Sequence, residues 1–351
     1  MGFFENTLFP PSSEDKFALL ARLWNLCDDF RSHEAEYDGA AYLAYYGQQC
    51  SHAGHDEEHI LVSTHHDICE LATQILQGAS REDIICRLSL KYPDLGGEMD
   101  LDRTVRLNNS VDLAARLVSM VNVGVPCCTA GRGGEPLIWA QGPLNEFLRA
   151  HFNQPSQDKT HVKLDFSFKG RNLERLGRIR VDWTSKLEDH LLLTDDSERR
   201  VAIFHHASFL KCQQSSACST LPSEIVEETL RTIALLFPQS EKRTVKWFRK
   251  KCTRYPHLDS HLIKCGGLRP NDRQIEKFRF WRDRLIILKE AFDEKTKPST
   301  FSQLWYDRRN RLQWSTFWVA ILVLILTVFF GIVQSIEGAL QVYKTYHPTA
   351  G

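Results

Sequence analysis

Five histidines lie within a short stretch of the chain, close enough together to raise the question of a metal site. His55 and His59 stand four residues apart, so on a helix both imidazoles would share one face, as paired histidines do at a zinc ion. A zinc site needs further ligands, and the sequence shows neither a third ligand at a recognisable spacing nor the HEXXH pattern. We therefore expect a solvated histidine-rich loop rather than a metal centre, made up of His52, His55, His59, His65 and His66 with Cys50 and Asp56 beside them.

A second group of residues could in principle supply a nucleophile and a base. Asp189 precedes His190, and Cys212 follows the pair His205 and His206 closely. A cysteine beside an imidazole can act as a nucleophile, but no third member and no oxyanion hole can be assigned. Neighbouring residues of a strand point to opposite faces, so we expect at most one histidine of the pair to look inward. The sequence predicts packed sheet histidines and no catalytic residue.

The remaining candidates for cofactor chemistry are weaker. The glycine-rich run GRGGE at 131–135 lacks the GxxxxGK[ST] frame of a phosphate-binding loop, and no GxGxxG joins a strand to a helix. A turn or the tip of a wing is the expected structure. The ten cysteines form no CxxC pair, which favours free thiols in a reducing compartment. No metal, nucleotide or other cofactor is predicted.

A dense basic stretch is the strongest candidate for a binding surface. Trp247 and Phe248 are interleaved with its cations, and further arginines recur at 279, 282 and 284. Next to a membrane, such cations would attract anionic lipid headgroups, each gaining about 1 kcal/mol. The same composition suits nucleic-acid phosphates, neutralisation of the acidic half of the chain, or a solvated helix face. We expect contact with anionic lipid first, through Lys242, Arg243, Lys246, Arg249, Lys250, Lys251 and Arg254.

The net charge of zero conceals a strong asymmetry along the chain. Residues 1–150 hold 22 acidic and 11 basic side chains, whereas 151–351 hold 22 acidic and 33 basic ones. Within the second part, residues 241–311 hold 20 basic and 9 acidic side chains. Because the first half has the wrong sign for phosphate, nucleic acid is disfavoured as a partner.

The elements that must position this basic stretch include a membrane anchor. Residues 314–333 read WSTFWVAILVLILTVFFGIV, twenty positions without a charge. A helix of this length spans about 30 Å, the thickness of a hydrocarbon core. Trp314, Phe317 and Trp318 lie at one end, where aromatic rings prefer the headgroup boundary. A transmembrane helix is therefore predicted at 312–334, in preference to a buried core helix.

Charges beside the apolar run predict its orientation. Arg308, Arg309 and Arg311 precede it, and Lys344 alone follows it. Since positive charge stays cytosolic, the long N-terminal part is expected in the cytosol and the short tail beyond the membrane. The opening residues have no basic region before an apolar run, so no secretory signal is predicted. This is the tail-anchored arrangement, and we expect the endoplasmic reticulum or another secretory membrane rather than the mitochondrial outer membrane.

The acidic half shows helical periodicity. Apolar residues at helical spacing predict helices near 17–27, 37–46, 68–75, 84–88 and 113–121, and Pro143 opens another. Three helices, the glycine-rich turn and a short strand-like run at 137–139 together resemble the outline of a winged helix.

The middle of the chain changes to strand periodicity. Alternating apolar residues predict strands at 162–168 and 179–183, with a third at 201–204 and a short helix capped by Thr184. Helices then return, including a long one from Asn271 or Asp272 to Phe292. The fold class expected is mainly α with a small β-containing middle region (α+β), a winged-helix-like N-terminal half and one C-terminal transmembrane helix.

Three runs of sequence resemble a known group of proteins. They are WYDRRNRLQWSTFWVAILVLILTVFFGIVQSIEGALQVYKTYHP at 305–348, VDWTSKLEDHLLLTDDSERRVAIFHHASFL in the middle, and FALLARLWNLCDDF near the start. All three are similar to a large, uncharacterised family of predicted proteins of filamentous ascomycete fungi that carry a C-terminal transmembrane segment. The resemblance implies a fungal origin but brings no active site to carry over.

Together these observations predict a tail-anchored membrane protein whose cytosolic part is an interaction or scaffold module. Its expected partners are the lipid bilayer, anionic lipid headgroups and a protein that the sequence does not name. A membrane-tethered nucleic-acid binder is the alternative, and an enzyme centred on His190, His205 or Cys212 is the third class. The expected division is N-terminal helices and histidine-rich loop (1–66), winged-helix-like unit (67–155), sheet-plus-helix unit (156–220), basic helical neck (221–311), transmembrane helix (312–334) and translocated tail (335–351).

Overall fold

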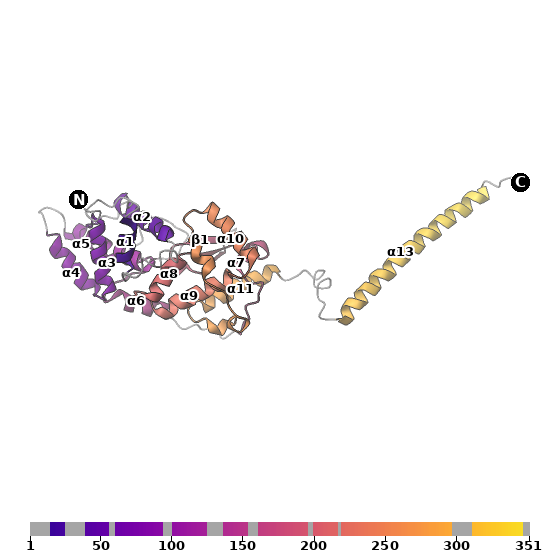
Figure 1. Cartoon of the computed structure of the whole chain (residues 1–351). Helices are drawn as coiled ribbons and strands as arrows, with labels where there is room; N and C mark the ends of the chain where they lie inside the picture. The colour runs from indigo at the N-terminus through magenta and orange to yellow at the C-terminus, as the bar shows by residue number, and fades with distance from the viewer. Residues whose placement is uncertain are drawn as a thin grey trace. The chain divides into compact units, whose positions relative to one another are not determined.

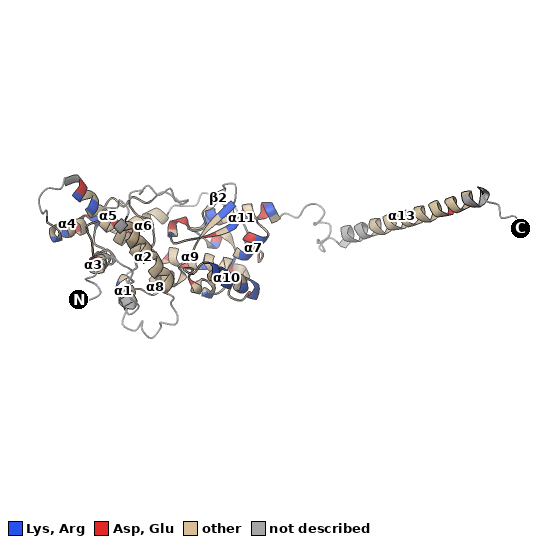
Figure 2. Ribbon diagram, turned by 90° about the horizontal axis from the view of Figure 1, so that it is seen from above, with Lys and Arg blue, Asp and Glu red and all other residues tan. Residues whose placement is uncertain are grey.

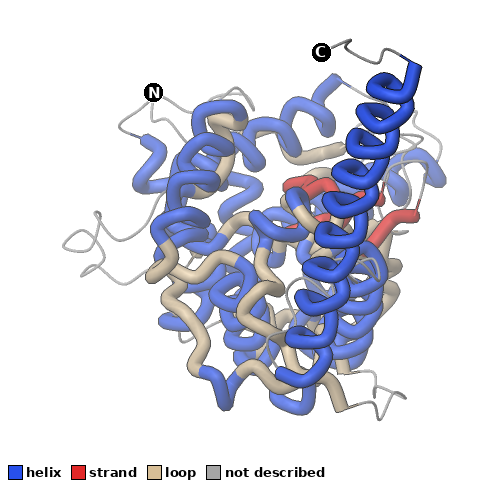
Figure 3. Tube along the Cα trace, turned by 90° about the vertical axis from the view of Figure 1, so that its right-hand side faces the viewer, coloured by secondary structure: helices blue, strands red, loops and turns tan. Residues whose placement is uncertain are grey.

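The computed structural model describes most of the chain and divides it into two compact units (Figure 1). The described residues are 15–24, 39–55, 60–93, 100–124, 136–153, 161–195, 199–216, 219–296 and 311–346. The first unit comprises Met1–Lys295 and the second Thr296–Gly351. The finer division of the first unit into separate segments stays a prediction. Within the described residues, helix predominates and strand is confined to one small sheet (Figure 3).

The first part of unit 1 is helical, as its periodicity predicts. Thr64 begins one helix with a capping box, because its hydroxyl accepts the Asp67 amide while the Asp67 carboxylate accepts the amide of Thr64. Ser80 caps the next by accepting the Asp83 amide. The helices are α1 (Asp15–Leu23), α2 (Gly39–His55), α3 (His65–Leu76), α4 (Arg81–Lys91), α5 (Asp100–Ser119) and α6 (Leu144–Phe152).

The winged helix expected in this part is not shown. The predicted strand at 137–139 is reduced to an isolated parallel bridge between Leu137 and Val123. Trp139 is instead a buried anchor whose Nε1 donates to the Gly142 carbonyl over 3.0 Å. The glycine-rich run at 131–135 lies outside the described residues.

A three-stranded sheet occupies the middle of unit 1, in the order β1-β3-β2. The strands are β1 (Arg180–Thr184), β2 (Leu193–Asp195) and β3 (Arg199–Phe204). β3 runs parallel to β1, with Val181 opposite Val201, and antiparallel to β2. The strands predicted at 179–183 and 201–204 are confirmed. β2 has only three residues, too few for an alternation to be recognised, and the predicted short helix is a single 3-10 turn, η3 (Leu187–Asp189).

The strand predicted at 162–168 is wrong, although its alternation is regular. Residues 162–164 lie beside the segment around Arg273 with one bridge, Lys163 to Gln274, and the chain then turns. The Arg273 guanidinium takes the carbonyls of Leu164, Asp165 and Phe168, so they are not available to a sheet. As a result Phe166, expected to be buried, is 63% exposed.

The rest of unit 1 is again helical. It contains α7 (Gly170–Arg175), α8 (Ala207–Ser215), α9 (Ser223–Leu236), α10 (Lys242–Arg254) and α11 (Arg282–Thr296), with 3-10 turns η4 (Ser260–Lys264), η5 (Pro270–Asp272) and η6 (Ile275–Lys277). The long helix predicted from Asn271 is wrong, because α11 begins only at Arg282. The buried Glu228 carboxylate accepts the amides of Arg279 and Trp281, each over 2.8 Å, and so fixes the chain just before that start. One hydrophobic cluster extends from α1 to α11.

Unit 2 contains one described element, the helix α13 (Arg311–Tyr346). The part from Val319 to Val342, 24 residues with a mean hydropathy of 2.7, is long and apolar enough to cross a membrane. None of that span is buried within the protein. The predicted C-terminal apolar helix is therefore confirmed, and it continues as helix beyond the expected end at 334.

Candidate functional site

The inner side of α10 is tied to the core of unit 1. Thr244 and Phe248, four residues apart, are both buried. Trp247 and Lys251, on the flank, both bind the Glu174 carboxylate of α7, through Nε1 at 3.1 Å and Nζ at 2.7 Å. Lys251 also lies over the Trp247 ring, 5.2 Å from its centroid. One of the seven predicted cations, Lys251, therefore belongs to a structural ion pair.

The opposite side of α10 presents the other six cations to solvent. At 3.6 residues per turn, Lys242, Lys246, Arg249 and Lys250 fall within an arc of about 100°. We call the exposed set the cationic face, and Figure 2 shows its basic residues along α10. Apart from Arg254, which lies over the Tyr255 ring, its members have no ion-pair or ring partner in the part of the chain that the structure describes. The face comprises Lys242, Arg243, Lys246, Arg249, Lys250 and Arg254.

The predicted topology and interface residues are only partly covered. Arg308 and Arg309 lie outside the described residues. Arg311 begins α13, and Trp314, Phe317 and Trp318 lie in its first turns, although their side chains are outside the description. Their roles in orientation and membrane contact stay predictions.

The histidine-rich stretch does not form a single structural feature. His65 is buried at the start of α3, and its Nδ1 lies 2.7 Å from the Tyr46 hydroxyl. His52 and His66 are exposed, His59 lies outside the described residues, and the side chain of His55 is not described. Among the described residues no group of three or more His, Cys, Asp or Glu side chains is arranged to hold a metal ion.

His190 is a fully bonded core residue. Its Nδ1 accepts the Phe204 amide over 3.1 Å, which leaves Nε2 to carry the proton and donate to the Thr232 hydroxyl over 2.7 Å. Burial, followed by the nearby Arg284 charge, lowers the pKa of His190 to about 3. The imidazole thus stays neutral and holds the sheet against α9.

Both members of the second histidine pair are buried, contrary to expectation. β3 ends at Phe204, so His205 and His206 no longer alternate across a strand, and their ring centroids lie 3.9 Å apart with the planes tilted by 30°. His206 Nε2 lies 2.9 Å from the hydroxyl of Ser185, which follows β1. Sequence reasoning missed Ser185, because only the parallel pairing of β1 and β3 brings these two strand ends together.

This serine–histidine pair lacks the features of a catalytic site. Burial, followed by His205, lowers the pKa of His206 well below its ordinary value, and no described carboxylate contacts its ring. An imidazole that cannot hold a proton is a poor general base. Cys212 is also buried, and burial raises the pKa of its thiol, which disfavours the reactive thiolate.

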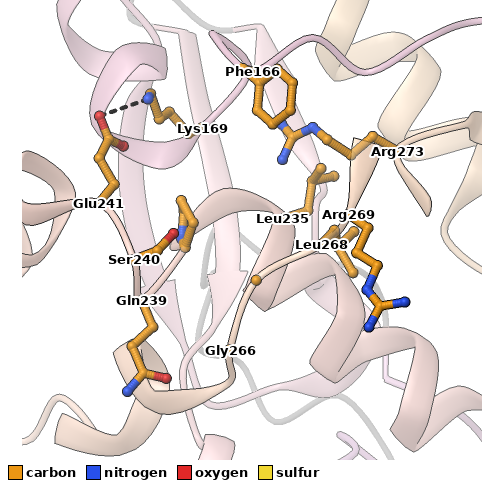
Figure 4. Close-up of a pocket in the computed structure, with 12 residues that line it drawn as sticks. Phe166, Lys169, Leu235, Gln239, Ser240, Glu241, Gly266, Leu268, Arg269 and Arg273 are labelled. Carbon is orange, nitrogen blue, oxygen red and sulfur yellow. Dashed lines mark ion pairs between the residues drawn. The ribbon is translucent and has the colours of Figure 1, made fainter. Parts of the chain in front are cut away.

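A cavity of about 630 Å³ opens beside the start of α10. We call it the Arg273 pocket, and its lining consists of Phe166, Lys169, Leu235, residues 238–241, residues 266–269 and Arg273 (Figure 4). On one side Lys169 Nζ binds Glu241 Oε1 over 2.7 Å, and the Thr244 hydroxyl donates to the other oxygen over 2.6 Å. Burial alone would raise the pKa of Glu241, but these two hydrogen bonds hold it below its ordinary value.

On the other side of the cavity lies the buried Arg273, only 4% exposed. Its Nε and Nη2 donate to the carbonyls of Leu164, Asp165 and Phe168 over 2.7 to 3.2 Å. Its Nη1 has no hydrogen-bond partner among the described residues. Burial lowers the pKa of Arg273, an effect that Asp165 opposes. Arg269 belongs to the same lining and is exposed.

No protein family model matches this chain. Searches of curated proteins and of solved structures found no match either. The resemblance to the fungal group therefore stays a prediction, and the function has to be argued from the residues themselves.

Proposed function

We propose that this protein is anchored in a membrane through α13, in the tail-anchored arrangement, with unit 1 in the cytosol as an interaction module. The cationic face of α10 contacts the anionic headgroups of the membrane that holds the anchor. The proposed address is the endoplasmic reticulum or another secretory membrane.

The observation that carries this proposal is that no residue in the apolar span of α13 is buried within the protein. Thirteen large apolar side chains between Val319 and Val342 are each 45–64% exposed, whereas unit 1 buries its apolar residues in one cluster. Removing one such side chain from water is worth roughly 1.5–3 kcal/mol. An exposed helix of this composition is therefore strongly driven into a bilayer, where its backbone hydrogen bonds are already satisfied.

The charges on either side of α13 support the orientation. Three arginines, Arg308, Arg309 and Arg311, precede the span, and Lys344 is the single basic residue after it. The excess of positive charge is retained in the cytosol during insertion.

The link to the anchor supports lipid contact by α10. Thr296 and Arg311 are separated by 15 residue steps, so a fully extended chain between them reaches at most about 50 Å. Unit 1 is thus held at high effective concentration beside the headgroups. Each cation near an anionic leaflet gains about 1 kcal/mol, and the five cations without ion-pair or ring partners are available for this contact.

The anchor is tested with a glycosylation acceptor fused after Gly351, combined with alkaline carbonate extraction of the membranes. A glycosylated product that resists extraction is expected. A control that carries Asn108→Gln silences the Asn-Asn-Ser sequon in unit 1 and isolates the fused acceptor. A carbonate-resistant product glycosylated at Asn108 would show the inverted orientation, and release by carbonate would refute the anchor.

Lipid contact by α10 is tested by flotation of residues 1–310 with vesicles that contain phosphatidylserine. Charge reversal at three positions, Lys246→Glu, Arg249→Glu and Lys250→Glu, should abolish flotation. A matched control reverses three exposed cations elsewhere, Arg87, Arg149 and Lys277, and should float normally. Flotation that is unchanged by the α10 substitutions would refute lipid contact. Binding to RNA instead, with a steep salt dependence, would favour the nucleic-acid alternative.

A further inference from the structure

The Arg273 pocket contains a buried cation whose hydrogen bonds are incomplete. A guanidinium has five N–H donors, and the three protein carbonyls leave the two on Nη1 without a described partner. Nη1 is not among the fully buried side-chain atoms that lack a partner, so it is open to the cavity, where an anionic ligand can accept both of its donors. Figure 4 shows the Arg273 guanidinium beside the Phe166 ring, within the pocket.

The charges of the lining select an anion. Lys169 and Glu241 neutralise each other, and Glu241 is the one carboxylate among the lining residues. Arg269 and Arg273 remain as cations of the lining, and the Asp165 carboxylate, which lies outside the lining, offsets part of the Arg273 charge. Arginine binds phosphate through paired N–H donors in a planar fork, with hydrogen bonds roughly twice as strong as neutral ones.

The size and the rim of the pocket suggest which anion. A volume of about 630 Å³ lies within the range of ligand sites and is much larger than a bare phosphate needs. Phe166, 63% exposed, has its ring centroid 5.0 Å from Arg273 Cζ and forms an apolar rim. Glu241 lines the pocket and directly precedes Lys242, the first residue of the cationic face, so both surfaces belong to one region of unit 1.

We propose that the Arg273 pocket binds a phosphate monoester carried on a small polyol, such as a phosphorylated headgroup. Arg273 Nη1 and Arg269 bind the phosphate oxygens, and the rest of the cavity accommodates the polyol. The proposal rests on the proposed function for the lipid source of the ligand. The same chemistry is offered by a membrane lipid and by a soluble phosphate ester, and the experiment separates the two.

The test is isothermal titration calorimetry, which measures the binding of two probes to full-length protein in neutral detergent. One is a short-chain phosphatidylinositol monophosphate, and the other is the soluble inositol bisphosphate that corresponds to its headgroup. Saturable binding is expected, and Arg269→Gln should weaken it about tenfold or more, since a charged hydrogen bond is lost. Arg269 is exposed, so this variant leaves the fold intact, whereas Arg273 substitutions would strip three carbonyls of their donor. Arg87→Gln on α4 is the matched control and should bind normally.

Comparison of the probes identifies the source. Tighter binding of the lipid than of the soluble ester, with the difference removed by Phe166→Ser, supports a membrane lipid. Equal binding, sensitive to Arg269→Gln, supports a soluble ester. The absence of binding of both probes, or binding that Arg269→Gln leaves unchanged, would overturn the proposal. Because the cationic face is intact in these variants, a failure here is distinct from a failure of α10 to bind vesicles.

Discussion

His190 and Arg273 are both buried polar residues of unit 1, yet their surroundings differ in one decisive respect. Each ring nitrogen of His190 has a protein partner, the Phe204 amide and the Thr232 hydroxyl. Arg273 has partners for Nε and Nη2, but its Nη1 is without one among the described residues and lies in the lining of a cavity. A fully bonded neutral group contributes to the fold, whereas a cation with spare donors beside a cavity is prepared for a ligand. The contrast explains why we assign a structural role to His190, one of the residues that the sequence offers as an enzyme centre.

The largest expected effect comes from removing the imidazole of His190, which has a protein partner at each ring nitrogen. His190→Ala should destabilise unit 1 by about 3–5 kcal/mol, because it leaves a cavity and an unpaired Phe204 amide. The Thr232 hydroxyl loses its donor but keeps its bond to the Thr229 carbonyl. Urea unfolding followed by circular dichroism measures this loss. His66→Ala, at an exposed position of α3, is the control and should change stability by less than about 0.5 kcal/mol. A small loss in His190→Ala would mean that the site is not structural.

Glu188 provides a third buried polar group and sharpens the comparison. Its Oε1 accepts the Asn122 amide, but its Oε2 is buried without a partner. Burial, together with the neighbouring Asp189, raises its pKa to about 7, although its own amide, that of Asn122 and the Lys186 charge act against the shift. The folded state therefore binds the Glu188 proton more tightly than the unfolded state does. The stability linked to this bound proton is fully present below about pH 4.5. It is lost as the pH rises to about 7.

Glu188→Gln should therefore stabilise the unit above pH 7, by up to about 3 kcal/mol, and match the wild type below pH 4.5. Urea unfolding at several pH values measures the difference. Arg284 donates to the backbone carbonyls of Glu188 and His190, and these bonds remain in the variant. A difference in stability that does not change with pH would contradict the burial of a titrating carboxyl group.

The smallest expected effect tests ligand binding in the Arg273 pocket directly. A ligand that completes the bonds of Arg273 should stabilise the folded unit by about 1.4 kcal/mol when its concentration is tenfold above its dissociation constant. Thermal unfolding of full-length protein with inositol bisphosphate measures this shift. The shift should disappear in Arg269→Gln and persist in Arg87→Gln. An equal shift in both variants would contradict a specific site.

How much could be predicted from the sequence depends on how local each feature is. The helix and the basic residues of the cationic face follow from local sequence, but the pairing of Lys251 with Glu174, 77 positions away, does not. The Arg273 pocket depends on bonds between residues 105 to 109 positions apart, for which a single sequence has no periodic pattern. The prediction of a strand at 162–168 fails for the same reason, because Arg273, distant in the sequence, binds the carbonyls that a sheet would need. Ser185 was likewise missed, since the hydrogen bond that joins it to His206 requires the sheet to form first.

The one acidic residue within the apolar span of α13 sets the depth at which the helix can sit. Residues 312–336, all without a charge, separate this residue, Glu337, from Arg311 by a length of about 37 Å along a helix. With its carboxylate at the far interface, that uncharged length would exceed a hydrocarbon core of about 30 Å and would be accommodated by tilt. Sliding the helix back toward the side of Arg311 would draw the carboxylate into hydrocarbon, at a cost that grows with depth. Glu337 would thus act as a stop that opposes withdrawal of the anchor toward its N-terminal side.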